Sequence, residues 1–418
     1  MILDSFLDMN KFIQNKQFWH LFRAIEKHGG VLRFVGGAVR DALAGIEGSD
    51  IDLATDMSPE ELMEACAEEG FKTVPIGIKF GTLGVLVDGK VLEITSLRKD
   101  VKTDGRHAEV EFTDDWIADA SRRDLTINAV YADEKGNVFD YFNGIEDLKN
   151  GVVRFIGNPA QRVSEDYLRI LRFFRFYSMF GKTPIDAKAL KACVENKDNL
   201  KTLSIERIRD ELIKLAMTEN FVPTLKIMFE NNILDYILPA SDRIDKLEHL
   251  IKTVSALKLE KSALRRLFVL YCPNEELALN LAERMHLSRK QKDIMQKWAR
   301  VSVSIKDFSD EKIVKRYVYM YGKEFCRDRL IIEYAIEKAD YTDLPAQLDL
   351  IERIKIKKFP LNGRDIMQMA PVPEKNIGLI LKKLEQKWVE SDFSRSADEL
   401  KKDAAEMIKT LADNRCLL

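Results

Sequence analysis

Two neighbouring runs decide how the N-terminal part of the chain folds: Phe34-Val35-Gly36-Gly37-Ala38-Val39-Arg40-Asp41, and shortly after it Ser49-Asp50-Ile51-Asp52-Leu53. In the first run an apolar strand is expected to end in two glycines, and a helix follows. Glycines let the backbone turn sharply and approach a ligand closely, and free N–H groups at a helix start can hold phosphate oxygens. Arg40 would lie one turn into that helix, within reach of a triphosphate. Taken alone, this pattern is equally typical of a plain tight turn.

The second run carries two acidic residues that alternate with apolar ones. Residues two apart in a strand point to the same face, so Asp50 and Asp52 should present their carboxylates side by side while Ile51 and Leu53 are buried. Two close carboxylates repel each other, which favours a bound divalent cation, and hard oxygen ligands suit Mg²⁺. A lone Asp-x-Asp is usually a turn or surface feature. Its position after the glycine turn, heading an apolar strand, favours a metal site.

Further short apolar runs indicate more strands at residues 31–35, 83–87, 91–95 and 128–132. Glu93 lies in one of them, where it could complete the metal site or form a salt bridge with Arg98. A helix is predicted from Ser58 to about Gly70, because Ser58, Pro59 and Glu61 form a capping box with proline at the first helical position. Strands first, with a few helices, indicate an α/β or α+β head.

Two polar segments of this head contain candidate ligand contacts. Residues 97–107 are charged and include Gly105, which predicts a mobile loop. In Ser121-Arg122-Arg123-Asp124-Leu125-Thr126-Ile127-Asn128, the paired arginines could bind phosphate, and Asp124 and Asn128 could bind a ribose hydroxyl. The alternative for this run is an exposed, charged helix end.

From about residue 158 onward, apolar residues recur three and four apart, which predicts helices almost throughout, including 164–181, 205–217, 262–271, 276–285 and 310–321. With 418 residues, the chain should form two to four structural units. The net charge of -2 gives no sign of a globally basic protein, so any nucleic-acid binding needs a local basic surface. Five scattered cysteines argue against a disulfide framework. No signal peptide or membrane span is expected, which favours the cytoplasm.

Taken in order, the motifs resemble those of class II CCA-adding tRNA nucleotidyltransferases and bacterial poly(A) polymerases. The matching residues run from Gly36-Gly37 with Arg40-Asp41, through Asp50-x-Asp52 and Arg122-Arg123-Asp124 with Asn128, to Asp140-Tyr-Phe-Asn-Gly144, Glu165-Asp166-x-x-Arg169, Arg207 and Glu211. The resemblance implies an α+β protein with a DNA polymerase β-like head, in which helices accompany a mixed sheet, followed by an all-α remainder. It implies a catalytic head at 1–150, a nucleotide-reading neck at 151–220, a tRNA-binding helical body at 221–358 and a helical tail at 359–418.

The resemblance also implies a mechanism and roles for individual residues. Two Mg²⁺ ions would be held by Asp50 and Asp52, with Glu93 as an additional candidate, for two-metal nucleotidyl transfer from CTP and ATP. The nucleotide would contact the following residues: Gly37, Arg40, Arg122, Arg123, Asp124, Asn128, Asp166, Arg169, Arg172 and Arg175. Asp166 and the three arginines after it would form a polar ridge on one helix. In that ridge, Asp166 and Arg169 would imitate a base-pairing edge that accepts C and A and rejects G and U.

The segment from Arg98 to His107 resembles the family's flexible loop, with Asp104 and Arg106 as its acidic and basic residues. Because this loop is not shortened, addition of C, C and A to tRNA lacking its 3′ CCA is preferred over partial addition. Basic clusters at Arg265-Arg266, Arg289-Lys290, Lys315-Arg316 and 355–358 are candidate RNA tracks or solvated helix faces. No protein partner or membrane is implied.

Four other functions remain open on the sequence. A poly(A) polymerase, or a tRNA enzyme that adds only CC or only A, would use the same head and metals. A non-catalytic RNA-binding module would not need to keep both carboxylates. An enzyme acting on a small substrate would not need so long a helical body.

Overall fold

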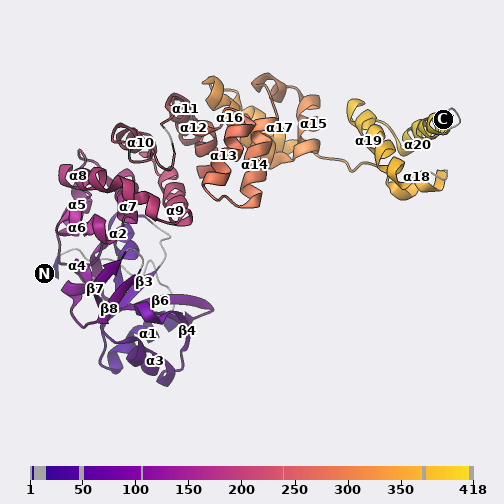
Figure 1. The fold of residues 1–418 in the computed structure, drawn as a ribbon. Coiled ribbons are helices and arrows are strands. Elements are labelled where there is room, and N and C mark those ends of the chain that lie inside the picture. Colours follow the sequence, from indigo (N-terminus) through magenta and orange to yellow (C-terminus); the bar gives the residue numbers. More distant parts are fainter. Residues whose placement is uncertain are drawn as a thin grey trace. The chain divides into compact units, whose positions relative to one another are not determined.

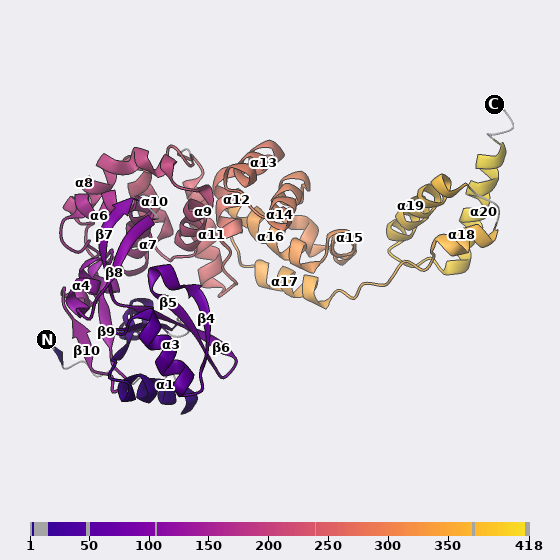
Figure 2. The ribbon, with the colours of Figure 1, turned by 60° about the horizontal axis from the view of Figure 1, so that its bottom comes forward.

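The computed structural model describes residues 2–3, 16–46, 51–104, 107–238, 240–369 and 373–413, with side chains left out at 2–3, 100–104, 107–109, 374–375 and 411–413. The chain divides into two compact units. The first comprises the described residues up to Ser241 together with Arg284–His286, and the second comprises the remainder. Strands and helices share the first unit, whereas the second is helical (Figures 1 and 2).

A mixed sheet organises the first unit, with strand order β1-β10-β9-β2-β3-β6-β5-β4 among the described residues. Its strands are β1 (Ile2–Leu3), β2 (Leu32–Val35), β3 (Asp52–Thr55), β4 (Lys72–Gly77), β5 (Thr82–Val87), β6 (Lys90–Ser96), β9 (Val130–Ala132) and β10 (Val138–Asp140). The pairing of β3 with β6 is parallel and the other pairings are antiparallel. The α+β head with a mixed sheet is therefore confirmed.

Each face of the sheet is covered differently. On one face the inward residues of β2, β3, β5 and β6 pack with α1 (Lys16–Lys27) and α3 (Pro59–Glu68) in one apolar core, where Phe34 and Leu53 are each 1% exposed. On the other face a smaller core, which includes Ala54 and Tyr131, covers β2, β3 and β9. The predicted capping box starts α3, because the Ser58 hydroxyl accepts from the N–H of Glu61 and the Glu61 carboxylate accepts from the N–H of Ser58.

Strand β10, the last of the sheet along the sequence, is followed by a turn that side-chain hydrogen bonds hold in place. The Asp140 carboxylate accepts hydrogen bonds from the N–H groups of Phe142, Gly144 and Ile145, at 3.2, 3.0 and 2.9 Å. A side chain at position 144 is excluded, because its Cβ would lie 2.2 Å from the backbone oxygen of Thr126. The chain is therefore fixed where the sheet passes into helix.

Helices complete the first unit. They are α2 (Gly37–Leu43), α4 (Trp116–Ser121), α5 (Gly144–Asn150), α6 (Pro159–Glu165), α7 (Leu168–Phe180), α8 (Ala187–Asn196), α9 (Ile205–Ala216) and α10 (Phe221–Glu230), with 3₁₀ helices at Ile78–Phe80, Thr126–Asn128 and Lys197–Thr202. Asn128 thus lies in a 3₁₀ turn before β9 and not in the predicted strand.

Two further predictions of local structure are wrong. The segment expected to be a loop at 97–107 instead forms a two-stranded hairpin of β7 (Arg98–Asp104) and β8 (His107–Phe112). The helix expected over 164–181 is broken at Asp166, whose backbone is extended. The Asp166 side chain accepts from the N–H of Leu168 at 3.1 Å, so it satisfies a free donor at the start of α7 and does not lie on that helix.

In the described part of the second unit every regular element is a helix. They are α11 (Ile244–Ala256), α12 (Ala263–Tyr271), α13 (Glu275–Arg284), α14 (Arg289–Arg300), α15 (Glu311–Tyr321), α16 (Lys323–Glu337), α17 (Leu344–Arg353), α18 (Gly363–Met369), α19 (Glu374–Glu390) and α20 (Ala397–Asp413), with a 3₁₀ helix at Ile305–Ser309. Trp388 lies in a separate apolar core of α18, α19 and α20. None of the described helices is long and apolar enough to cross a bilayer.

One predicted basic cluster of this unit is neither a track nor a solvated face. Arg265 and Arg266 are 4% and 3% exposed, and Arg265 binds the backbone oxygen of Glu260 and pairs with Asp328. Both arginines are therefore part of the interior.

Candidate active site

The glycine turn opens the site. Gly36 has a φ of 64°, a left-handed conformation that favours glycine, and its N–H donates to the Val130 carbonyl at 3.2 Å. A Cβ on Gly36 would lie 3.6 Å from Nη1 of Arg123, and one on Gly37 would lie 3.9 Å from Oδ2 of Asp52. The turn thus brings the glycines, an arginine and a predicted catalytic carboxylate together.

Asp52 is the first residue of β3, and its side chain is exposed while Leu53 is buried on the opposite face, as the alternation predicts. In the parallel pairing of β3 with β6, Asp52 is the register partner of Glu93, which is also exposed. Register partners in adjacent strands point to the same face. Asp50 lies outside the described residues, and within those residues no group of three acidic, histidine or cysteine side chains is placed to hold a metal.

A polar pocket of about 650 Å³ lies beside Asp52 and brings together every residue predicted to contact the nucleotide. Its lining includes Gly37, Arg40, Arg122, Arg123, Asp124, Asn128, Asp166, Arg169, Arg172 and Arg175, together with Gly36, Asp41, Asp52, Phe176, Met179 and Lys214. These residues come from segments more than a hundred positions apart in the sequence. We call this cavity the arginine pocket.

Asp119 on α4 holds two of these arginines, and it is not among the residues predicted from the sequence. Its Oδ1 accepts from Nε and Nη2 of Arg122, at 2.9 and 2.6 Å, and its Oδ2 accepts from Nε and Nη2 of Arg123, at 3.2 and 3.0 Å. The Tyr131 hydroxyl donates to the same Oδ2 at 2.7 Å. Burial alone would raise the pKa of this 1%-exposed carboxyl, but the two guanidinium groups outweigh burial and lower its pKa to about 2.

A second series of hydrogen bonds links side chains that line the arginine pocket. Arg40 donates from Nη1 to Oδ1 of Asn128 at 2.6 Å, and Nδ2 of Asn128 donates to Oδ1 of Asp124 at 3.0 Å. Oδ2 of Asp124 accepts from Nε of Arg172 at 2.7 Å. Burial opposes ionisation of Asp124, but the Arg172 charge prevails and lowers the pKa of that carboxyl well below its usual range. Asp124 therefore remains ionised although it is buried.

The neck helices supply the remaining charged residues. Nε of Arg175 donates to Oε2 of Glu211 on α9 at 2.6 Å. Arg169 forms an ion pair with Glu165 and donates to the carbonyls of Arg162 and Arg122 at 2.9 and 3.0 Å. Each arginine is thus fixed by an acceptor.

The expected pairing within the base-reading ridge is not what the contacts show. Oδ2 of Asp166 accepts from Nη2 of Arg207 at 2.7 Å, and Arg169 pairs with Glu165 instead. Arg169, Arg172 and Arg175 share α7, whereas Asp166 lies in the break before it. All four still line the arginine pocket. For the loop pair, only the backbone of Asp104 is described, in β7, and Arg106 lies outside the described residues.

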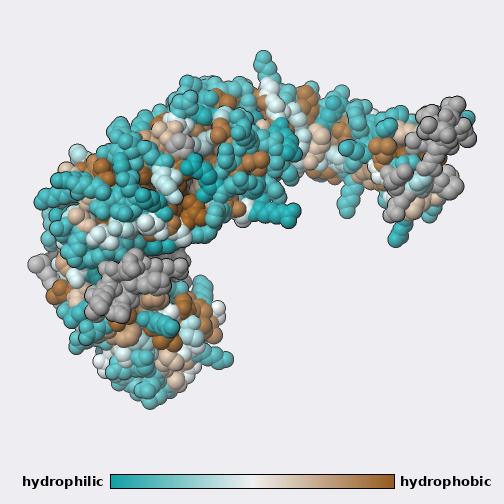
Figure 3. Space-filling view, in the orientation of Figure 1, coloured by the Kyte–Doolittle hydropathy of each residue, from teal (hydrophilic) through white to brown (hydrophobic). Residues whose placement is uncertain are grey.

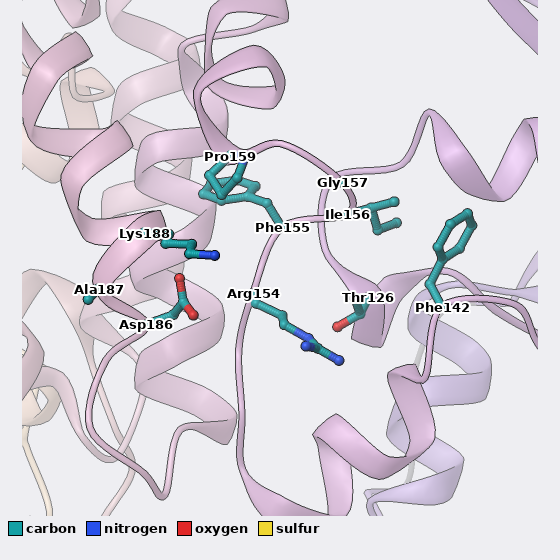
Figure 4. A pocket seen from close by; sticks show the side chains of 10 residues that line it. All are labelled: Thr126, Phe142, Arg154, Phe155, Ile156, Gly157, Pro159, Asp186, Ala187 and Lys188. Carbon is teal, nitrogen blue, oxygen red and sulfur yellow. The ribbon is translucent and has the colours of Figure 1, made fainter.

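A separate cavity of about 490 Å³ in the first unit is lined by residues 154–157, by the first residues of α6 and α8, and by Thr126 and Phe142 (Figure 4). Figure 4 shows the Arg154 side chain directed toward Thr126. Both side chains donate to Oδ2 of Asp147, at 2.7 Å from Nε of Arg154 and 2.6 Å from the Thr126 hydroxyl. These groups are engaged in holding the fold, and none of the predicted site residues lines this cavity.

The second unit has an open pocket of about 710 Å³ between α14 and the junction of α15 with α16. Arg289, Lys290 and Lys297 on its rim are exposed, and Trp298, which also lines it, is 2% exposed. We call this cavity the α14–α16 pocket. Among the described residues, Nε1 of Trp298 has no hydrogen-bond acceptor.

Comparisons with known proteins agree with this architecture. Residues 32–154 match the family model "Poly A polymerase head domain", and residues 184–245 match "Probable RNA and SrmB- binding site of polymerase A". A crystal structure of the Bacillus stearothermophilus CCA-adding enzyme in complex with CTP has the same fold, with a TM-score of 0.70 at 23% identity, covering 96% of this chain and 98% of that one. The fold and the site therefore define a nucleotidyltransferase with a poly(A) polymerase-type head.

Two curated relatives show to which family of nucleotidyltransferases the chain belongs. The chain is 35% identical to "CCA tRNA nucleotidyltransferase 1, mitochondrial" of Danio rerio, over 93% of this chain and 92% of that protein. It is 29% identical to the "CCA-adding enzyme" of Ligilactobacillus salivarius, over 93% and 96%. The chain belongs to the family of class II CCA-adding tRNA nucleotidyltransferases and bacterial poly(A) polymerases.

Proposed function

We propose that this enzyme adds C, C and A, without a template, to the 3′ end of tRNA that lacks them, using CTP and ATP. The observation that carries the proposal is the arginine pocket beside Asp52, in a chain that matches CCA-adding relatives along almost all of their length. The solved relatives include the Thermotoga maritima CCA-adding enzyme complexed with tRNA_CCA, which has a TM-score of 0.63 at 22% identity and covers 97% of this chain.

The donor set at β3 and β6 fits Mg²⁺. Asp52 and Glu93 are register partners and both are exposed, so two hard carboxylates lie side by side, and Asp50 precedes Asp52 by two positions. Asp50 and Asp52, with Glu93 as an additional ligand, would hold two ions. When bound, these ions would activate the RNA 3′-hydroxyl and neutralise the charge that develops on the triphosphate.

The chain's own side chains bind and orient the nucleotide. Arg40, Arg122 and Arg123, with Gly37, would contact the triphosphate; Arg122 and Arg123 are held by Asp119, so little side-chain entropy is lost on binding. A carboxylate offers about four acceptor positions. Asp124 uses three of them, on Leu125, Asn128 and Arg172, and so has about one left for a ribose hydroxyl. This supports Asp124 and Asn128 as the residues that select ribose.

Base selection belongs to the neck. Asp166 can accept from the exocyclic amine that C and A share, and Arg169 can donate to a ring acceptor, while Arg172 and Arg175 hold the α7 side of the pocket. Arg207 keeps the Asp166 carboxylate oriented at 2.7 Å. In this proposal the head at 1–150 is catalytic, the neck at 151–220 reads the base, and the body at 221–358 and the tail at 359–418 bind tRNA. The segment with Asp104 and Arg106 would act in the change from C to A.

The cytoplasm remains the proposed location. The cysteines in the described part of the chain, Cys66, Cys193, Cys272 and Cys326, are buried and free, which suits a reducing compartment. Fluorescence microscopy of a tagged chain tests this, since several relatives are named mitochondrial.

The sequenced 3′ end of the product tests the function. A tRNA transcript ending before its CCA is incubated with CTP, ATP and Mg²⁺, and the product should end in CCA. Tails of A alone would identify a poly(A) polymerase. Transcripts ending one or two nucleotides later in the CCA separate an enzyme that adds only CC or only A.

A further inference from the structure

An exposed apolar surface lies on the β4–β5–β6 end of the head sheet. Val74 and Ile76 on β4 and Val91 on β6 are 44%, 48% and 48% exposed, and Leu86 on β5 is 36% exposed. Hydrophobic residues, coloured brown, are visible at the surface of the head near these strands in Figure 3. A Cβ at Gly84 would lie 2.7 Å from both Ile76 and Val91, so these two side chains close over the glycine and form a continuous floor. We call these four side chains and Gly84 the apolar floor.

The apolar floor shares a face with the candidate metal ligands. Successive register pairs link Asp52 to Glu93, Glu93 to Gly84, and Gly84 to Val74, which forms one row across β3, β6, β5 and β4. Val91 lies two residues before Glu93 and therefore points to the same side. The carboxylates and the floor are one uninterrupted surface.

The other end of this face is already occupied. Over β2, β3 and β9 it is covered by the small core that contains Ala54 and Tyr131, and the arginine pocket opens beside it. The strand order places β2 and β9 on one side of Asp52, and β6, β5 and β4 on the other. Relative to Asp52, the arginines and the apolar floor therefore lie toward opposite ends of the sheet.

We propose that the apolar floor binds the bases of the last nucleotides of the acceptor RNA, an inference that rests on the proposed function. In-line displacement places the attacking hydroxyl and the leaving pyrophosphate on opposite sides of the reacting phosphorus. With the triphosphate held by the arginines, the RNA end approaches over Glu93 and β6. The nucleotides behind the hydroxyl then lie on the floor, where base faces bury apolar area without sequence preference.

The positive charge beside the apolar floor and the backbone of edge strand β4 both favour RNA over a second copy of this chain as what the floor binds. Lys72, the register partner of Leu86, is exposed on the same side as the floor and is placed to meet a phosphate. Edge strand β4 contains Pro75, which has no N–H, and a register shift between Pro75 and Gly77. Both features oppose strand pairing with another molecule.

The test compares two variants of the full-length enzyme. Val74→Thr combined with Val91→Thr keeps the branched shape and removes apolar surface at two exposed positions. Val31→Thr, at a position 40% exposed and outside the floor, is the matched control. The double variant should raise KM for tRNA lacking CCA roughly three- to ten-fold, where ten-fold corresponds to ~1.4 kcal/mol. KM for CTP and the melting temperature should equal those of the wild type and the control.

A photo-crosslinking residue, p-benzoylphenylalanine at position 91, locates the RNA directly. Crosslinks to the last three nucleotides of the same tRNA support the proposal. Unchanged KM for tRNA in the double variant, or crosslinks confined to the acceptor duplex, overturn it even while the wild type makes CCA ends. A crosslink to a second copy of the chain, with a dimer mass in sedimentation, overturns it as well. Failure of the wild type to extend tRNA would instead refute the proposed function, and the crosslink would still report what the floor binds.

Discussion

The arginine pocket and the α14–α16 pocket have similar volumes, about 650 and 710 Å³, but they hold positive charge in opposite ways. In the arginine pocket the side chains of Arg40, Arg123 and Arg175 are 8%, 19% and 11% exposed, and each pairs with a carboxylate. In the α14–α16 pocket Arg289 and Lys290 are exposed on the rim.

The difference matches the two kinds of anion that this family handles. Buried, fixed guanidinium groups suit a small ligand of one shape, because the geometry is set before binding. Exposed cations suit a long polyanion, where each phosphate contact adds little and salt weakens the sum. Under the proposed function, charge held by carboxylates would serve nucleotide recognition, and charge left at the surface would serve RNA recognition.

Loss of a proposed metal-binding carboxylate should have the largest effect. Asp52→Asn keeps the shape of the side chain and removes its charge, so kcat for nucleotide addition should fall by about 10³-fold or more. Affinity for tRNA in a gel shift should stay the same, because RNA binding does not use this group. Glu64→Gln, on the exposed side of α3, is the control. Activity near the wild-type level in Asp52→Asn would remove Asp52 from the catalytic site.

Replacing Asp119 tests whether arginines fixed by a carboxylate are what distinguishes the arginine pocket from the α14–α16 pocket. Asp119→Asn leaves two guanidinium groups without their carboxylate, which should cost about 3–5 kcal/mol of unfolding free energy. KM for CTP and ATP should rise by about ten-fold or more, while tRNA affinity changes little. Tyr131→Phe removes one hydrogen bond to the same carboxylate and gives a milder variant if Asp119→Asn does not fold. Unchanged KM values in a folded variant would show that Asp119 serves stability alone.

The same carboxylate predicts a pH dependence of stability. Its folded-state pKa is lowered from 3.8 to about 2, so its contribution is fully present above the unfolded pKa and is lost as pH falls toward 2. At 1.36 kcal/mol per pKa unit this amounts to about 2 kcal/mol. In urea unfolding between pH 5 and 2.5, the difference between wild type and Asp119→Asn should shrink as pH falls. A constant difference across that window would contradict the assignment.

The smallest effect is expected at the second pocket. Arg289→Gln with Lys290→Gln should weaken tRNA binding a few-fold and reduce the slope of log K against log salt by about 0.7–0.9 for each phosphate that the variant no longer neutralises. KM for CTP should not change. Lys191→Gln, on the exposed side of α8, is the control. An altered KM for CTP would contradict the proposal that the arginine pocket binds the nucleotide and the α14–α16 pocket binds only RNA.

Local chemistry made much of this structure predictable. The capping box at Ser58 and the alternation around Asp52 are properties of neighbouring residues, and both are present as expected. The motif residues Arg123 and Arg172 could be named from the sequence because they recur in a known order. The pocket that joins them was predicted by resemblance and not by spacing.

The errors have physical causes that a one-dimensional pattern hides. Asp166 interrupts a helical apolar pattern because its short side chain caps the next helix. The charged segment before Gly105 forms a strand because it pairs with residues 107–112, in which every second residue is apolar from Ala108 to Phe112. Glu211 finds its partner 36 positions away. Asp119 did leave a signal, since it stands three and four residues before two arginines at the end of a helix.

The turn at Asp140 bears on how conformations of this enzyme should be compared. Three hydrogen bonds to one carboxylate, and a glycine that tolerates no side chain, join the end of β10 to the first turn of α5. Strand β10 and helix α5 should therefore move together as one rigid piece. The N–H of Val152 donates to the Asp147 carbonyl, the N–H of Thr126 to the Arg154 carbonyl and the N–H of Ile156 to the Asp124 carbonyl, so this rigid piece extends through residue 156. Any pivot of the neck relative to the sheet therefore has to lie in the backbone torsions beyond Ile156.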